Sequence, residues 1–248
     1  MGKYLGAVLT VLIIGAGVAG VVAGVGIAAH ELPLMKAQAS GSQANGYKSV
    51  TLHIQTFPNS PYENPDWIQK HVTGQKDFGF DFPPSGDNQD WVTYWPTTTL
   101  QVPTHAIVTV VLDNYDGATP LLNPFYATPR GVTDDQGTAT NSISVDGKPV
   151  TSVDPGNVSH TFTIHSIVDG AQPWLFVTVP VTAVADDAKL DAGGFPFQPV
   201  QTVFSFVTPD KPGHYIWQCF DPCGSGFNGF GGPMSTKGYM SGTLDVVG

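Results

Sequence analysis

The last third of the chain contains three side-chain types that bind soft metal ions. Cys219 ends a strand-like run, GHYIWQC, and Met240 precedes a second run, SGTLDVV. His160 lies at the start of a third run, HTFTIHS, further upstream. A thiolate, an imidazole and a thioether held together by separate strands form a ligand set suited to copper. A core methionine and a structural histidine remain the alternatives at Met240 and His160.

The two cysteines of the chain, Cys219 and Cys223, have the spacing C-x-x-x-C. Two cysteines this close can be a redox pair, a metal-binding pair or a disulfide that closes a short loop. They cannot supply the framework of a disulfide-dense secreted domain, which needs several bridges.

The elements that must position these residues are predicted to be short β-strands. Charged residues make up only 12% of the 248 residues, while Gly (29) and Pro (21) are abundant, a composition typical of a β-rich fold with many turns. The apolar alternation favours strands in several runs separated by turns: Ser49–Thr56, Thr99–Asn114 interrupted at Pro103, Ser159–Ile167, Trp174–Val181, Thr202–Val207, His214–Cys219 and Thr243–Val247. This order predicts an all-β antiparallel sandwich or barrel. A short helix is expected near Trp67–His71, within the longer segment Tyr62–Asp90.

Strand parity predicts which side chains share a face with the cysteine. Tyr215 and Trp217 have the parity of Cys219, so we expect them to be core aromatics beside the site. His165 and His214 have the opposite parity and should face away from it. Three isolated histidines are expected to be surface or structural residues: His53, His71 and His105.

The charge of the chain limits its partners. The formal net charge is −10, and Arg130 is the single arginine. A nucleic-acid groove needs clustered positive charge, so this class is set aside. The acidity fits a domain that docks on basic partners.

The N-terminal run Leu5–Ala29 has no charge and no proline, and it exceeds the roughly 20 residues that cross a bilayer. We therefore expect a single-pass anchor at residues 1–30, a linker at 31–47 and one extracytoplasmic domain at 48–248, with Lys3 on the cytoplasmic side. A signal peptide cleaved after Ala39 is the alternative, although the run is longer than a usual signal sequence. The G-x-G-x-x-G within this run lacks the following βαβ unit of a dinucleotide fold.

The C-terminal strands resemble those of the cupredoxin family. The pattern G-x-Y-x-W-x-C ending at Cys219 is similar to the strand that carries the copper cysteine of blue-copper proteins. Met240-x-Gly242-x-Leu244 is similar to the methionine before their last strand, and Ser159–Phe162 to their first-histidine strand. Val102–Asp116 resembles a cupredoxin strand with its Asn-containing turn. The resemblance implies a Greek-key β-sandwich and a copper site that includes His160, Cys219 and Met240.

The sequence departs from this family between the cysteine and the methionine. No histidine lies there, whereas blue-copper sites have one. Instead Cys223 gives a spacing that resembles the dinuclear copper centre of cytochrome c oxidase subunit II. The histidine positions of that centre are occupied here by Phe227 and Lys237. The predicted metal set is His160, Cys219, Cys223 and Met240, with Met234 as a second candidate for the axial thioether and with the copper number left open.

The resemblance implies an electron carrier, and with the anchor predicted at residues 5–29 we expect it to work with a redox protein in or at the membrane. The apolar side chains of Phe220, Phe227 and Phe230 would surround the copper. One alternative is an electron-entry or accessory subunit of a terminal oxidase. The other is a copper-free structural domain with a Cys219–Cys223 disulfide. The H-x-H motifs of multicopper oxidases are missing, so an enzyme acting alone is not expected.

Overall fold

The computed structural model describes residues 34–37, 39, 41–42, 45–58, 92–167, 172–190, 196, 198–221, 233–235 and 237–248. The predicted anchor at residues 5–29, the segment 62–90 with its predicted helix, and Cys223 lie outside these residues. Within the described part of the chain, no helix combines the length and the apolar character that a membrane crossing requires.

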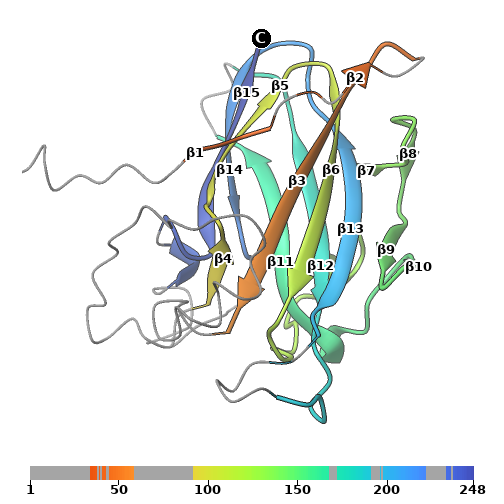
Figure 1. The fold of residues 1–248 in the computed structure, drawn as a ribbon, viewed down its shortest axis with the longest axis vertical. Helices are drawn as coiled ribbons and strands as arrows, with labels where there is room; N and C mark the ends of the chain where they lie inside the picture. Colours follow the sequence, from red (N-terminus) through yellow and green to blue (C-terminus); the bar gives the residue numbers. More distant parts are fainter. Residues whose placement is uncertain are drawn as a thin grey trace, which may run out of the picture.

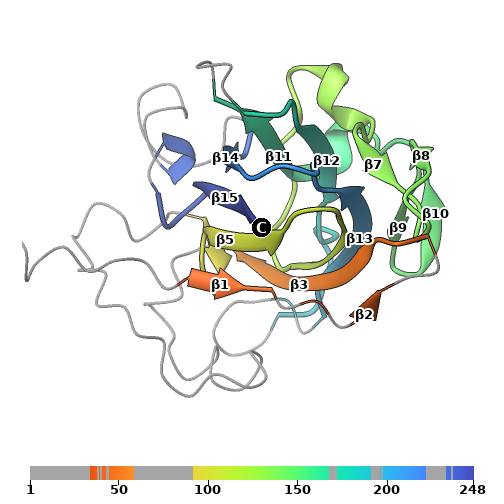
Figure 2. The same ribbon diagram turned by 90° about the horizontal axis from the view of Figure 1, so that it is seen from above.

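The described strands form two sheets that face each other across one hydrophobic core (Figure 1; Figure 2). The first sheet has six strands in the order β1-β5-β15-β14-β11-β12. Their bounds in that order are Leu34–Lys36, Thr99–Pro103, Ser241–Val247, Gly213–Gln218, Val158–Ser166 and Phe176–Thr182. His160 lies in β11, Cys219 directly follows β14 and Met240 directly precedes β15. The three predicted ligands that the structure describes therefore lie in or next to this sheet.

The second sheet follows the order β10-β9-β13-β6-β3-β2, with β4, β7 and β8 paired beside this path. The main strands are β10 (Lys148–Val150), β9 (Ile143–Val145), β13 (Val200–Val207), β6 (Ala106–Asn114), β3 (Lys48–Phe57) and β2 (Gly41–Ser42). The side strands are β4 (Thr93–Trp95), β7 (Val132–Thr133) and β8 (Ala139–Thr140). Among the residues that the structure describes, three short 3₁₀ helices lie in the connections: η2 (Pro124–Ala127), η3 (Pro155–Asn157) and η4 (Pro233–Ser235).

Period-two alternation explains how most strands form the core. In β3 the inward positions Val50, Leu52 and Ile54 are at most 1% exposed, as the alternation predicts. Strand β11 differs, because its first seven residues are all buried. A second, smaller apolar cluster near η2 and η3 includes the first residue of β11 and consists of Leu121, Ala127, Val153 and Val158. The segment that includes η2 packs against β12, the strand next to β11 in the first sheet.

Every predicted strand run corresponds to an observed strand, and the prediction of an all-β sandwich is confirmed. The expectation of an antiparallel sandwich is wrong in part, because β3 pairs with β6 and β15 pairs with β5 in parallel. The chain leaves the second sheet after β4, forms β5 in the first sheet and returns as β6 beside β3. Strands separated by such a crossover can run in the same direction.

The carbonyl of Thr98 ties the first sheet together next to the predicted site. It accepts hydrogen bonds from the indole N–H of Trp217 and from the backbone N–H of Thr243, both at 3.0 Å. Gly242, which is opposite Trp217 in the β14–β15 register, leaves room for this carbonyl. A Cβ atom at Gly242 would lie 1.8 Å from the Thr98 oxygen. Because that contact is with backbone, no side-chain movement can relieve it.

We predict that Gly242→Ala lowers the free energy of unfolding by about 3 kcal/mol, the upper part of the range for overpacking a core. Gly41→Ala is the matched control, because a Cβ there would have no neighbour within 4 Å. That control should change the free energy of unfolding by less than about 0.5 kcal/mol. Urea unfolding followed by tryptophan fluorescence measures both values, and equal effects would contradict the packing role of Gly242.

Candidate metal centre

Cys219 and Met240 are brought together by the pairing of β14 with β15. The ladder pairs Gln218 with Ser241, and the next backbone bond runs from the N–H of Cys219 to the carbonyl of Met240 at 3.0 Å. Residues that are directly opposite in an antiparallel pair project from the same face. Both side chains are 0% exposed, so this face is the core. The structure therefore brings these two predicted ligands side by side at the end of the β14–β15 ladder.

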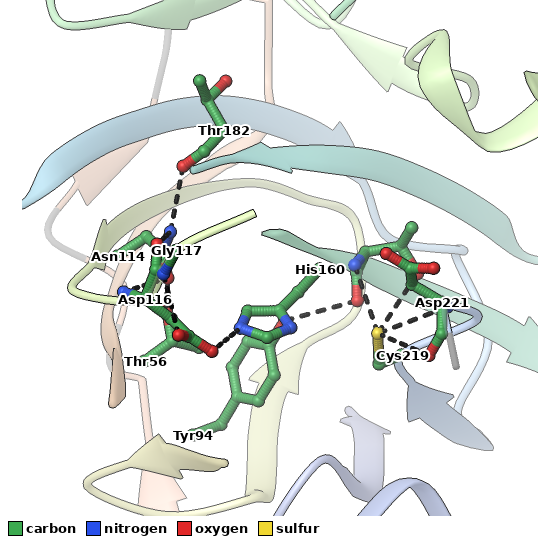
Figure 3. Close-up of polar contacts among 10 residues, drawn as sticks. Thr56, Tyr94, Asn114, Asp116, Gly117, His160, Thr182, Cys219 and Asp221 are labelled. Atoms are coloured by element: carbon green, nitrogen blue, oxygen red, sulfur yellow. Dashed lines mark hydrogen bonds and ion pairs between the residues drawn. The ribbon is translucent and has the colours of Figure 1, made fainter. Parts of the chain in front are cut away.

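His160 approaches from the other neighbour of β14. Strand β11 pairs Thr163 with Gln218, which places Phe162 beside Cys219 as the two strands continue. His160 has the same parity as Phe162, and its side chain is completely buried. Figure 3 shows the imidazole between Asp116 on one side and Cys219 on the other. The structure thus places His160 and Cys219 at one buried end of the first sheet.

The sulfur of Cys219 accepts hydrogen bonds from two backbone amides. The N–H of Thr161 lies 3.3 Å from the sulfur and the N–H of Asp221 lies 3.4 Å from it (Figure 3). The hydroxyl of Thr161 is 3.9 Å from the same atom, and it also accepts the N–H of Phe220 at 2.7 Å. Donors directed at a sulfur favour its thiolate form, which is the form that binds metals.

The protonation of His160 is controlled by two hydrogen bonds that oppose the effect of burial. Burial is the largest single effect and lowers the pKa of His160, but the hydrogen bonds to Asp116 and Cys219 together with the negative charges of these two groups raise the pKa to about 9. In the metal-free protein the ring therefore carries a proton on both nitrogens at neutral pH. A metal ion that binds the imidazole must displace one of them, so its affinity depends on pH.

Asp221 is a second acidic group next to Cys219, and sequence analysis did not single it out. Its side chain is 0% exposed, and both carboxyl oxygens have no hydrogen-bond partner among the described residues. Burial, followed by the charge of Cys219, raises the pKa of Asp221 to about 7, while the charge of His160 opposes this shift. An unpaired carboxyl group in the core is stable mainly in its neutral form.

Of the two remaining candidate ligands, the structure describes Met234 but not Cys223. Met234 is 1% exposed and lies six residues before Met240, whose N–H donates to the carbonyl of Pro233 at 3.0 Å, so both thioethers are buried, although only Met240 is opposite Cys219 in the ladder. Within the described ranges, no three side chains of His, Cys, Asp or Glu converge in a way that could hold a metal ion. The candidate set among these residues is therefore His160, Cys219 and a methionine, and the predicted ligand Cys223 lies outside them.

The parity predictions for the neighbouring side chains are confirmed. Tyr215 and Trp217 are 0% exposed in the core, while the His214 side chain is 54% exposed and contacts Asp245. His165 points to the outer face of the sheet, where its ring packs edge-on against Phe220 with 5.7 Å between centroids. His105 bonds to Asp210 at the far end of β6, and His53 is exposed.

The sequence contained only an indirect signal for Asp116, which contacts His160. The Asn-containing turn after β6 was noted as a family-like feature, but nothing local connects it to a histidine 44 residues later. In the fold the two residues are in direct contact, because the carboxylate of Asp116 lies 2.9 Å from Nε2 of His160.

No model of a protein family matches the chain, and no curated protein matches it. The solved structure of the copper protein rusticyanin is similar at 14% identity and a TM-score of 0.24, over 83% of this chain and 85% of that one. The McoA multicopper oxidase of the hyperthermophile Aquifex aeolicus is similar at 9% identity and a TM-score of 0.26, over 85% of this chain and 32% of that one. Neither likeness is strong enough to transfer a ligand or an activity.

We predict that Asp221→Asn removes part of the pH dependence of stability in the metal-free protein. Between about pH 4 and pH 7 the folded state keeps the Asp221 proton while the unfolded state releases it, since the pKa rises from 3.8 to about 7 on folding. The wild type should therefore lose stability relative to the variant as the pH rises through this window. The limiting slope is about 1.4 kcal/mol per pH unit.

Urea unfolding at several pH values measures this difference, with Asp187→Asn as the control because Asp187 is exposed. The control should follow the wild-type profile. A constant difference between wild type and Asp221→Asn from pH 4 to pH 7 would show that Asp221 is ionised in the folded protein.

Proposed function

We propose that this chain is a cupredoxin-like protein that binds copper at His160, Cys219 and Met240 and carries single electrons. The observation that carries the proposal is the environment of the Cys219 sulfur. It is completely buried, it accepts two backbone N–H groups, and a buried imidazole lies beside it. Buried polar groups with defined partners fix one arrangement of a site, which is what a metal centre for electron transfer requires.

The described donors fit copper by their chemistry. Thiolate and thioether sulfurs are soft ligands, and imidazole suits copper as well. Copper in such a site would supply a one-electron couple. The strands hold the donors from three directions, so uptake and release of an electron need little movement of the chain. Cys223 is proposed as a further ligand, because C-x-x-x-C places a second sulfur close to the first in the chain.

A chain of aromatic rings supports an exit for the electron at one surface. Phe220 follows Cys219 directly, and its ring stacks on Tyr126 with 5.3 Å between centroids. Tyr126 in turn contacts Phe125 at 5.1 Å, and the Phe125 side chain is 44% exposed. The guanidinium of Arg130 lies 4.2 Å above the Phe125 ring. These contacts connect the thiolate position with a surface that a redox partner could approach.

The remaining parts of the proposal concern location and role. We propose that residues 5–29 anchor the domain in a membrane, with the domain on the extracytoplasmic side, and that the partner is a redox protein at that membrane. In this role the protein is a carrier and not an enzyme. A subunit of a terminal oxidase is the second candidate, and it is favoured by the C-x-x-x-C spacing of Cys219 and Cys223. A structural domain with a disulfide between these cysteines would bind no copper.

We predict that the full chain loaded with Cu(II) has an intense thiolate-to-copper absorption band, and that Cys219→Ser abolishes it by removing the charge-transfer donor. Cys223→Ser should change the position or intensity of the band, because a second sulfur ligand alters the copper environment. The control is His214→Ala, which removes an exposed histidine remote from the site and should leave the spectrum unchanged. No band in the wild type would favour the structural alternative, and unchanged spectra in both cysteine variants would exclude a cysteine-bound metal.

We predict that Met240→Leu leaves copper bound but raises its redox potential. The thioether is a weak, long ligand, and leucine conserves the volume of this buried position. Met234→Leu is the matched control, since this methionine is equally buried but is not opposite Cys219 in the ladder. Spectroelectrochemical titration measures both potentials. A shift with Met234→Leu alone would reverse the assignment of the axial ligand.

A further inference from the structure

Asp116 connects the buried imidazole to the backbone at the end of β6. One carboxylate oxygen lies 2.9 Å from Nε2 of His160, and the other accepts the N–H of Gly117 at 2.7 Å. The side chain of Asp116 is 18% exposed, while that of His160 is 0% exposed. The carboxylate therefore reaches the ring from the edge of the core, and solvent has little access to the bond between them.

The backbone of Asp116 is held in place by Asn114, which is itself completely buried. The amide oxygen of Asn114 accepts the hydroxyl of Thr56 at 2.7 Å and the N–H of Asp116 at 3.2 Å. Its amide nitrogen donates to the carbonyl of Asp116 at 3.0 Å and to that of Thr182 at 2.9 Å (Figure 3). The carbonyl of Asp116 also accepts the N–H of Val184 at 2.9 Å. Strands β3, β6 and β12 thus fix the position from which the carboxylate acts.

The chemistry of the pair decides which nitrogen of the ring is available. An ionised carboxylate only accepts hydrogen bonds, so Nε2 of His160 must carry a proton to bond with Asp116. Nδ1 is then the nitrogen that can become a lone-pair donor, and it lies on the side of the ring that faces Cys219 (Figure 3). A carboxylate on the second nitrogen also makes an imidazole a stronger ligand and favours the more positive state of a bound metal.

We propose that Asp116 is the positioning residue of this centre: it keeps the Nε2 proton of His160, turns Nδ1 toward Cys219 and stabilises Cu(II) relative to Cu(I). The part that concerns copper rests on the proposed function, whereas the part that concerns the ring does not. A neutral acceptor at this position would orient the ring equally well but would lack the negative charge. The two effects can therefore be separated with two substitutions.

The first test uses the metal-free full chain and reads the ring directly. In ¹⁵N-edited NMR spectra the Nε2–H proton of His160 should be a downfield, slowly exchanging signal. It should be retained in Asp116→Asn, where the amide oxygen still accepts, and lost in Asp116→Ala. Asp113→Asn is the control, because Asp113 lies in β6 as well but bonds to Gln201 of the neighbouring strand β13, outside the site. A signal that persists unchanged in a folded Asp116→Ala protein would overturn the positioning role, whatever the chain does with copper.

The second test measures copper in the same variants. Asp116→Ala should weaken Cu(II) binding about tenfold to a hundredfold, the usual cost of losing such a partner. Asp116→Asn should bind copper with a raised redox potential, while Asp113→Asn should match the wild type in both properties. An unchanged potential in Asp116→Asn would overturn the electrostatic part. If the wild type binds no copper, the proposed function fails, and the NMR result still decides whether Asp116 positions the ring. If Asp116→Ala does not fold, Asp116→Asn carries the copper test, and loss of the Nε2–H signal in that folded variant would overturn the claim that an acceptor at this position is enough to hold the ring.

Discussion

The register of β14 between β11 and β15 is the constraint on which the whole candidate centre depends. A slip of one residue would turn every side chain of β14 to the opposite face, and the sulfur of Cys219 would leave the core. Tyr215 and Trp217 prevent this slip, because they are large, completely buried and of the same parity as Cys219. The indole bond of Trp217 to the carbonyl of Thr98 adds a directional restraint. Ordinary core packing therefore determines where the reactive sulfur lies.

The second sheet contributes orientation rather than ligands. Asn114 at the end of β6 bonds to β3 through Thr56 and to β12 through Thr182, and so holds the turn that contains Asp116. The imidazole of His160 then lies between a strand of the first sheet and a carboxylate from the end of the second. Because the amide of Asn114 is fully hydrogen-bonded in the core, moving this turn would leave several buried polar groups unsatisfied. The two sheets are thus coupled at the site.

Much of the fold and part of the site could be predicted from local sequence patterns. The alternation of apolar and polar residues predicted the seven long strand runs. Strand parity correctly predicted that His214 faces away from the side of the sheet on which Cys219 lies. The parallel pairs and the short strands β7 to β10 could not be predicted, because they depend on crossovers and on tertiary contacts that leave no periodic signal. Asp116 and Asp221 were missed for a related reason. Both resemble ordinary turn residues in sequence, and only long-range packing brings one to His160 and buries the other beside Cys219.

The charges explain how such a site can fold before any metal binds. His160 is the cationic group between the carboxylate of Asp116 and the sulfur of Cys219, and both partners raise its pKa to about 9. The doubly protonated ring therefore balances negative charge that would otherwise be buried without compensation. Asp221, which lacks such a partner among the described residues, stays largely neutral up to about pH 7. A cation that binds on the Cys219 side of the ring would take the place of the proton on Nδ1. The proton on Nδ1 therefore occupies the position that a metal ion would take. Asp116 and Cys219, which stabilise the positive charge of the ring, would also stabilise the bound cation.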